Sequence, residues 1–316
     1  MKNRRKTAIL LTALLAAAVT CALAVGSESL SFFSLDENQQ AILYEIRLPR
    51  VLLGACVGAS LAVAGAGLQA LLRNPLAEPY LLGVSNGAAL GTMLSFGLFG
   101  SIAVARPAFA IIGAGIASAV VFRMAKSRSG MNVERLVLSG VIVTTFLSSI
   151  IVLLTSLLDA ARLRSFTFWL LGDLSQATYQ GFYLTLIASI AGTLAIASQS
   201  RALNLMMIGE RDALDFGVEV KRVRLVVFTA ASALVGASVA ASGSVGYVGL
   251  IVPHLLRLAI GSDNRLIVPF SALAGAIFVV FADTVARLAI APRELPVGAI
   301  TALVGAPMFI YLLRRS

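Results

Sequence analysis

The stretch RNPLAEPYLLGVSNG, residues 73–87, is a polar, proline-containing break between two long apolar segments. Pro75 and Pro79 lack a backbone N–H and do not fit inside a regular helix. Asn74 and Glu78 are costly to place in hydrocarbon, so this backbone must be packed in protein or reach water. The break therefore predicts a hairpin between two apolar helices, and its polar residues are the first candidates for function.

The composition places the chain in a lipid bilayer. Apolar residues make up 59% and charged residues 13% of the 316 residues, with a mean hydropathy of +0.93, as is typical of a membrane protein. A short tenth apolar run, residues 244–260, is broken by Pro253, and we count it because the last span otherwise runs in the wrong direction. The sequence thus predicts an all-α polytopic membrane protein with about ten transmembrane helices in one domain, residues 1–316. Nine runs are long enough to span a bilayer, namely residues 7–27, 49–72, 81–101, 104–125, 136–158, 180–199, 224–242, 268–290 and 296–313.

The charge pattern orients these helices. With ten spans and an inner N-terminus, 18 of the 25 basic residues fall on the inner side, as the positive-inside rule requires. Both termini are then expected in the cytoplasm, and the net charge of +10 reflects topology rather than nucleic-acid binding. The first apolar run shares the layout of a signal peptide, but it is long and lacks a small-x-small cleavage site, so we expect it to be retained. The basic residues on the outer side are Arg47, Arg50, Arg106, Arg162, Arg164, Arg287 and Arg293.

A short internal similarity indicates a repeat. The segment GASLAVAG, residues 58–65, agrees with GASVAASG, residues 236–243, at five of eight positions. The two segments lie in spans two and seven, which cross in opposite directions. This arrangement is typical of an inverted-topology repeat, which many transporters use to build a pathway between two halves, although short runs of small residues also match by chance.

A serine motif within the hairpin raises the alternative of an intramembrane protease. The run GVSNG, residues 83–87, satisfies the G-x-S-x-G pattern of a serine nucleophile, which needs a histidine to take its proton. The only histidine is His254, so an intramembrane serine protease using Ser85 and His254 is a remote alternative. Ser85 is more simply expected to be a helix N-cap.

The source of energy distinguishes an ion-coupled secondary transporter from a transporter driven by a separate ATPase. No G-x-x-x-x-G-K-[ST] phosphate-binding loop occurs in the sequence, so active transport would need a coupled ion or a separate ATPase. An ion-coupled secondary transporter usually has buried acids at mid-membrane, and the one candidate is Asp283. Arg287 follows four residues later, so we expect these two side chains to form a structural pair on one helical face.

The loop after span six is the second informative segment. Residues 208–224 predict a short amphipathic helix on the inner face, in which Gly209, Ala213 and Gly217 are four apart and leave one stripe without bulky side chains. Glu210 and Asp212 flank this stripe. The pattern predicts docking into a cleft of a soluble partner, with a solvated interfacial helix as the alternative.

Several stretches together resemble one family, the FecCD-type permeases, which are the membrane subunits of ABC importers for iron–siderophore complexes, haem and cobalamin. The resemblance covers nearly the whole chain in the family's order. It rests on RLPR (47–50), GASLAVAGAGLQALLRNPLAEPYLLGVSNGAALG (58–91), IGERDALDFGVEVKRVR (208–224), SGSVGYVGLIVPHLLRLAIGSDNR (242–265) and DTVARLAIAPRELPVGAITALVGAPMFIYLLRR (283–315).

The resemblance implies a transport subunit that is not itself an enzyme, in the plasma (inner) membrane of a bacterium or archaeon. The implied partners are a second, identical permease subunit, two cytoplasmic ATPase subunits that carry ATP and Mg²⁺, and an extracytoplasmic substrate-binding protein; this chain itself is expected to need no cofactor. A coupling helix at about residues 206–222 is expected to contact the ATPase. Its expected contact residues are Gly209, Glu210, Asp212, Ala213 and Gly217.

The resemblance also implies sites along the pathway. Arg47, Arg50 and Arg287 are expected to dock the binding protein, and a cytoplasmic gate is expected from Asn74, Pro75 and Leu76 together with Val133 and Glu134. In cobalamin permeases of this family small hydroxyl residues stand where this chain has Val133 and Glu134. The expected lining of the pathway, from spans five and ten, is Thr144, Thr145, Ser148, Ser149 and Thr301. An iron(III)–siderophore complex is the first expected cargo, with haem or cobalamin as the alternative.

Overall fold

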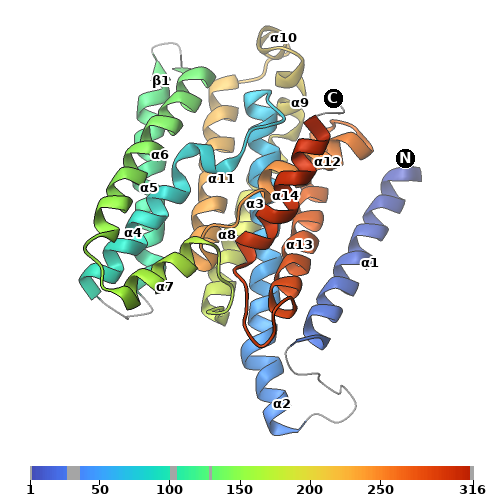
Figure 1. Ribbon diagram of the computed structural model, residues 1–316. Helices are drawn as coiled ribbons and strands as arrows, with labels where there is room; N and C mark the ends of the chain where they lie inside the picture. The colour runs from blue at the N-terminus through green and yellow to red at the C-terminus, as the bar shows by residue number, and fades with distance from the viewer. Residues whose placement is uncertain (1, 27–35, 100–104, 128–129, 314–316) are drawn as a thin grey trace.

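The computed structural model describes residues 2–26, 36–99, 105–127 and 130–313. In this part of the chain the regular structure is helical apart from one pair of two-residue strands (Figure 1). In chain order the elements are α1 (Lys2–Ala24), α2 (Glu37–Ala41), the π-helix η1 (Ile42–Arg47), α3 (Leu48–Leu72), the 3₁₀-helix η2 (Pro79–Leu82), α4 (Val84–Phe99), α5 (Ala105–Ala125), β1 (Lys126–Ser127), β2 (Gly130–Met131), α6 (Val133–Thr155), α7 (Ala160–Leu170), α8 (Tyr179–Ser198), α9 (Ser200–Ile208), α10 (Glu210–Asp215), α11 (Val220–Ser242), α12 (Val248–Ile260), α13 (Asn264–Leu288) and α14 (Val297–Leu313).

The all-α prediction and its spans are confirmed in outline. Each predicted span corresponds to one apolar helix of the described residues, namely α1, α3, α4, α5, α6, α8, α11, α12, α13 and α14. By length and composition seven helices, counting α2, η1 and α3 as one, are long and apolar enough to cross a bilayer, and α12 and α14 are shorter apolar helices. The expected break at Pro253 is wrong, because α12 continues through this proline. The predicted end of span three at residues 100–101 lies outside the described residues.

α3 forms the centre of the bundle. Its side chains are buried on every face, and it packs against α8, α11, α12 and α13. Two glycines allow this close approach: a Cβ on Gly58 would collide with the backbone of Gly275 in α13, and one on Gly65 with the backbone of Gly249 in α12. Small residues let membrane helices pack closely where hydrophobicity cannot drive association, so these glycines position α3.

The two similar segments lie on neighbouring helices. Gly58–Gly65 belongs to α3 and Gly236–Gly243 to the end of α11, and these helices pack together while running in opposite directions (Figure 1). Adjacent antiparallel helices are what an inverted repeat would require of these two segments. In each half the helix is followed by a non-helical segment that leads into a shorter helix, α4 or α12.

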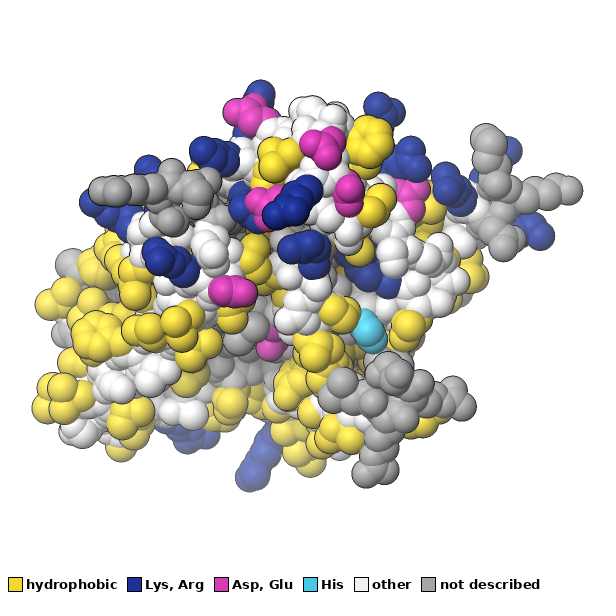
Figure 2. All heavy atoms as spheres, turned by 90° about the horizontal axis from the view of Figure 1, so that it is seen from above, with side chains coloured by type: hydrophobic (Ala, Val, Ile, Leu, Met, Phe, Trp, Pro, Cys, Tyr) yellow, Lys and Arg dark blue, Asp and Glu magenta, His cyan; other side chains and the backbone are white. Residues whose placement is uncertain are grey.

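The bundle has two distinct ends. One end carries α9, α10 and the first residues of α1, and we call it the α10 end; the other carries α2 and is called the α2 end (Figure 1). Viewed from the α10 end, many Lys and Arg side chains, with interspersed Asp and Glu, gather over this face (Figure 2). This charge distribution agrees with the predicted orientation, in which α10 lies on the basic side.

Candidate functional site

The hairpin of residues 73–83 is built by local backbone chemistry. α3 ends where Arg73 takes the left-handed conformation with φ 49°. The Asn74 side chain then accepts a hydrogen bond from the Leu76 N–H at 2.9 Å, a turn that asparagine favours. Asn74, Pro75 and Leu76 are exposed at the α10 end. Pro79 begins η2, where the missing N–H of proline is tolerated, and the chain continues into α4.

The hairpin pairs with the segment that follows α11. The Tyr80 hydroxyl donates to the Val245 carbonyl at 2.8 Å and accepts from the Val245 N–H at 2.9 Å. The Glu78 carboxylate accepts from the Tyr247 N–H at 3.2 Å. The two non-helical segments are thus joined directly, so polar backbone away from regular helices is satisfied by protein, as a bilayer requires.

Ser85 does not have the surroundings of a nucleophile. It lies inside the first turn of α4, which begins at Val84, so the expected role as helix N-cap is wrong. Its hydroxyl is buried and donates to the Ser244 hydroxyl at 3.4 Å. Because its hydrogen-bond partner is another hydroxyl group and not His254, a general base is not in place, and the protease alternative loses its support.

The contact between the hairpin and the segment after α11, residues 78–86 against 244–247, is called the seam below. Asn86 connects the seam to the hydroxyl groups of α6. Its amide donates to the Ser148 hydroxyl at 2.6 Å and to the Thr144 carbonyl at 3.1 Å. Thr145 and Ser149 are exposed on α6, and each hydroxyl donates to the backbone one turn earlier. The four expected lining residues of α6 are therefore split between an internal polar contact and an open helix face.

The remaining expected pathway and gate residues are more dispersed. Thr301 in α14 is fully buried and donates to the Gly298 carbonyl at 3.0 Å, so within this chain it does not line an open surface. Val133 and Glu134 begin α6, after Asn132, whose side chain caps the helix by accepting from the Arg135 N–H. The part of the hairpin that packs against α6 is η2, which follows the Asn74–Leu76 turn.

The three arginines expected to dock a partner are buried, and two of them, Arg50 and Arg287, form an ion cluster with Asp283 and Glu294. Arg50 binds Asp283 with two nitrogens, at 3.0 and 2.9 Å, and Glu294 with a third at 2.7 Å. Arg287 lies 3.3 Å from Asp283, which confirms the pair expected on one face of α13. Buried charges need such partners, because an unpaired charge in the interior is very unfavourable. The cluster is therefore part of the packed structure in this chain.

Two of these arginines also close the end of α1. Arg47 donates to the Leu23 and Ala24 carbonyls at 3.0 and 3.1 Å, and Arg287 donates to the Ala22 carbonyl at 2.9 Å. The last carbonyls of a helix lack intrahelical donors and carry partial negative charge. Arginine side chains satisfy both needs, so they fix the otherwise peripheral α1 to η1 and α13.

The loop around α10 differs from the helix and contact stripe that the sequence predicts. α10 is only six residues long, Glu210–Asp215, and Gly217 follows with φ 77°. Glu210 pairs with Arg224 at 2.7 Å, whereas Asp212 is exposed. The expected bare stripe through Gly209, Ala213 and Gly217 is wrong, because the Ala213 side chain is fully buried and faces the bundle.

The exposed face of this loop is instead apolar. Phe216 and Ile208 are each 75% exposed and Leu214 is 54% exposed, although apolar side chains that project into water carry a hydration cost. A cluster of this kind at a charged face is typical of a protein contact. The sequence already contained this signal, because the three apolar residues lie among charged ones. The glycine spacing instead predicted a contact face on the side of the helix that is buried.

The loop is tied to the rest of the α10 end through α9. The Asn204 side chain donates to Asp263 at 2.8 Å and accepts from the Asn264 N–H at 2.8 Å. Asp263 caps α13, and hydrogen bonding from Arg265 holds the pKa of its carboxyl well below the usual range. A continuous set of contacts therefore links α10, through α9, to the start of α13, whose far end holds the ion cluster.

Comparison with known proteins follows the same lines. The sequence model of the FecCD transport family matches residues 7–315. The cobalamin import system permease protein BtuC of Halobacterium salinarum is 41% identical, covering 89% of this chain and 76% of the relative. The hemin transport system permease protein HmuU of Yersinia pestis is 38% identical, covering 92% and 90%. An ABC transporter assigned to the metal-chelate type, solved in an inward-facing conformation, superposes with a TM-score of 0.91 at 34% identity, covering 99% and 100%.

Proposed function

Because this chain belongs to the FecCD transport family of ABC importer permeases, we propose that two copies of it form the pathway for inward passage of a bulky metal chelate. Hydrolysis of ATP, with its Mg²⁺, takes place on two separate cytoplasmic subunits, and an extracytoplasmic binding protein delivers the cargo. An iron(III)–siderophore complex is the first cargo to test. Cobalamin and haem are the second candidates, favoured by the names of two relatives.

The observation that carries this proposal is the seam, where the hairpin after α3 meets the segment after α11. Tyr80, Ser85 and Asn86 from one half meet Ser244, Val245 and the α6 hydroxyls. The groups are neutral and mostly satisfied by each other, so they join the two halves without leaving a strong polar group that would hold a passing solute. A large chelate needs such a pathway, because strong contacts along it would slow release.

The orientation follows from charge. We place the α10 end in the cytoplasm, with both termini, because Lys and Arg gather there (Figure 2) and basic residues are retained on the cytoplasmic side. The membrane is then the plasma (inner) membrane of a bacterium or archaeon. In this orientation the exposed Asn74–Leu76 turn and the start of α6 lie at the cytoplasmic exit, where a gate would have to close.

Coupling to the ATPase is assigned to the α10 loop. Ile208, Leu214 and Phe216 project from it and suit an apolar groove, while Asp212 supplies charge at the rim. Anchors of this kind carry most of the binding energy of an interface. The link from α9 to α13 through Asn204 offers a route by which movement of the ATPase reaches the bundle.

Docking of the binding protein is assigned to the arginine cluster at the α2 end. Glu294 is 43% exposed at its side chain, whereas Arg50 and Asp283 are buried. A carboxylate of the binding protein would therefore replace Glu294 at Arg50 before it could reach the deeper groups. Complementary charge of this kind favours correct register and fast association.

The test is transport by the complete assembly in proteoliposomes. The permease, its ATPase and its binding protein are reconstituted, and uptake of ferrichrome, hemin and cyanocobalamin is measured with and without ATP. We expect one of the three to accumulate only with ATP. Uptake driven by an ion gradient without the ATPase would instead support a secondary transporter. Ser85→Ala should retain uptake, since no step requires a nucleophile, and loss of proteolysis on a membrane substrate would revive the protease alternative.

A further inference from the structure

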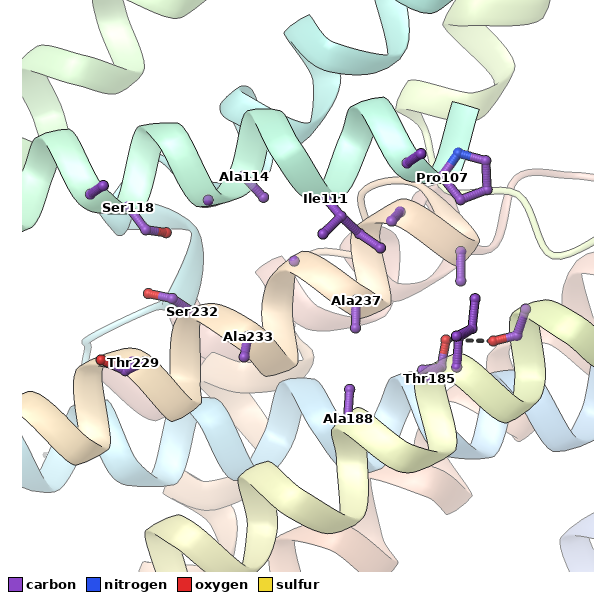
Figure 3. Close-up of a pocket in the computed structure, with 18 of the residues that line it drawn as sticks. Pro107, Ile111, Ala114, Ser118, Thr185, Ala188, Thr229, Ser232, Ala233 and Ala237 are labelled. Atoms are coloured by element: carbon purple, nitrogen blue, oxygen red, sulfur yellow. Dashed lines mark hydrogen bonds between the residues drawn. The ribbon is translucent and has the colours of Figure 1, made fainter. Parts of the chain in front are cut away.

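A long groove opens on the side of the bundle between α5 and α8, with α11 lying between them (Figure 3). Its volume is about 980 Å³. On α5 it extends from Pro107 to Phe122, which is about 22 Å at 1.5 Å per residue, a large part of the ~30 Å hydrocarbon thickness. None of the residues assigned above to the pathway, the gate or the docking surfaces lines it.

The groove exists because its lining side chains are small. Ala114, Ala188, Ala233 and Ala237 line it (Figure 3), and a Cβ on Gly115 would meet nothing within 4 Å. Larger apolar side chains such as Ile111, which projects from α5 toward α11 (Figure 3), and Leu184 also line it and are partly exposed. The surface is therefore concave, apolar and open to the hydrocarbon that surrounds the bundle.

Two hydroxyl groups lie in the wall of the groove. Ser118 on α5 and Ser232 on α11 point toward each other (Figure 3), and each is only 9% exposed. Neither hydroxyl has a hydrogen-bond partner among the described residues. Thr185, by contrast, donates to the Gly181 carbonyl at 2.8 Å. Ser118 lies one turn from Phe122 and Ser232 about midway along the α11 lining, so the two unused donors are in the half of the groove nearer the α10 end.

Basic residues continue the lining of the groove beyond this end. Lys126 follows the end of α5 as the first residue of β1, four residues after Phe122, and Lys221 lies on α11, four residues before Leu225. The strand β2, paired with β1, packs against α11, so both lysines lie beyond the same end of the groove. Both lysines are exposed, and no ion pair of either is found among the described residues.

We propose that this groove binds an anionic phospholipid of the leaflet at the α10 end. One acyl chain lies along the small residues of α5 and α11 and passes Ser118 and Ser232, and the phosphate lies beyond the end of the groove, near Lys126 and Lys221. Each lysine near a membrane surface favours an anionic headgroup. A transmembrane helix about 10 Å across would occupy roughly 1,700 Å³ over the same length, well above the volume of the groove, so a chain fits better than a helix.

The test measures lipid bound to the purified protein. Native mass spectrometry in mild detergent is carried out with added palmitoyl-oleoyl phosphatidylglycerol or phosphatidylcholine. We expect phosphatidylglycerol to bind about tenfold more tightly than phosphatidylcholine. Gly115→Trp, which fills the groove from an open position, should reduce binding of both lipids at least fivefold. The matched control is Ile116→Trp, one residue away and exposed outside the groove.

The headgroup is tested separately. The double variant Lys126→Gln/Lys221→Gln should lose the preference for phosphatidylglycerol while still binding phosphatidylcholine. Equal binding of both lipids by the unmodified protein, or no effect of Gly115→Trp, would overturn the proposal. A change of oligomeric state caused by Gly115→Trp, with bound lipid unchanged, would show that a second copy covers the groove instead. Gly115→Leu, a smaller filling, tests the groove if the tryptophan variant does not fold.

Discussion

The arginine cluster at the α2 end and the loop around α10 both contain several charged residues, but the cluster is buried and the loop is exposed. Arg50 and Arg287 are buried against Asp283 and bound by internal partners. The α10 loop exposes Phe216 and Leu214, and its ion pairs join Glu210 to Arg224 at 2.7 Å and Glu219 to Arg222 at 4.0 Å. Both regions are proposed to dock a protein, so the difference concerns how much each must change to do so.

The difference has an energetic meaning. A partner that binds the α10 loop covers apolar surface that is already presented, which is favourable without rearrangement. A partner that binds the arginine cluster must supply carboxylates that replace existing ones, so its net gain is smaller and its contribution lies more in register and rate. The following variants are ordered from the largest expected effect to the smallest.

Asp283→Asn should destabilise the protein by about 3 to 5 kcal/mol, because two buried arginines lose their shared counter-charge. The measurement is thermal unfolding in detergent, followed by intrinsic fluorescence. Asp215→Asn, which removes an exposed carboxylate of the α10 loop, is the control and should leave the transition unchanged. Equal stability of the two variants would mean that the cluster does not hold the α2 end together.

Phe216→Ala should leave stability unchanged but weaken binding of the ATPase by about 2 kcal/mol, roughly 30-fold, as expected for an aromatic anchor. Binding is measured with the purified ATPase subunit by microscale thermophoresis. Phe281→Ala removes a phenylalanine that is also exposed, on α13, and should bind normally. A reduced affinity in both variants would point to a general defect rather than to an anchor in the loop.

Gly217→Ala should weaken ATPase-coupled uptake by straining the turn after α10. The φ of 77° at Gly217 costs a residue with a Cβ about 1 to 2 kcal/mol. Gly217→Asn is the matched variant, because asparagine tolerates this conformation, and it should retain most uptake. If the asparagine variant fails equally, side-chain bulk against the partner is the problem, since a Cβ at this position meets nothing in this chain.

Glu294→Gln should increase the association rate of the binding protein a few-fold, because it removes the carboxylate that competes at Arg50. Stopped-flow fluorescence at low salt measures this rate. Glu45→Gln makes the same change of net charge at an exposed position of η1 and serves as the control. No difference between the two variants would assign the arginine cluster a purely structural role.

Much of the architecture was predictable because its causes are local. Apolar runs predicted the helices, and Pro75 and Pro79 predicted the hairpin, and these predictions are confirmed. The similarity of residues 58–65 to 236–243 predicted an inverted repeat, which stays a prediction. The pair of Asp283 and Arg287 was also predictable, since four residues separate them on one helix.

The direction in which side chains face was less predictable. Ala213 and Thr301 were expected to contact a partner or a solute, and both are buried in the bundle. Glu294 and Asn86 were not singled out, although each makes a decisive contact, with Arg50 and Ser148 respectively. Their partners are more than 60 residues away in sequence for Asn86 and more than 240 for Glu294, so no local pattern indicates them.

The sequence by itself determined that this is a membrane-spanning helical permease with a basic side, a broken hairpin and a charged loop. Hydrophobic length, charge bias and backbone-breaking residues act within a few turns of chain, and they need no tertiary information. Only the tertiary structure decided that the outer arginines are neutralised internally, that the loop presents an apolar face, and that small residues of α5, α8 and α11 leave a groove. Those outcomes depend on which helices meet, because burial and charge compensation are properties of neighbours that the chain brings together from far apart.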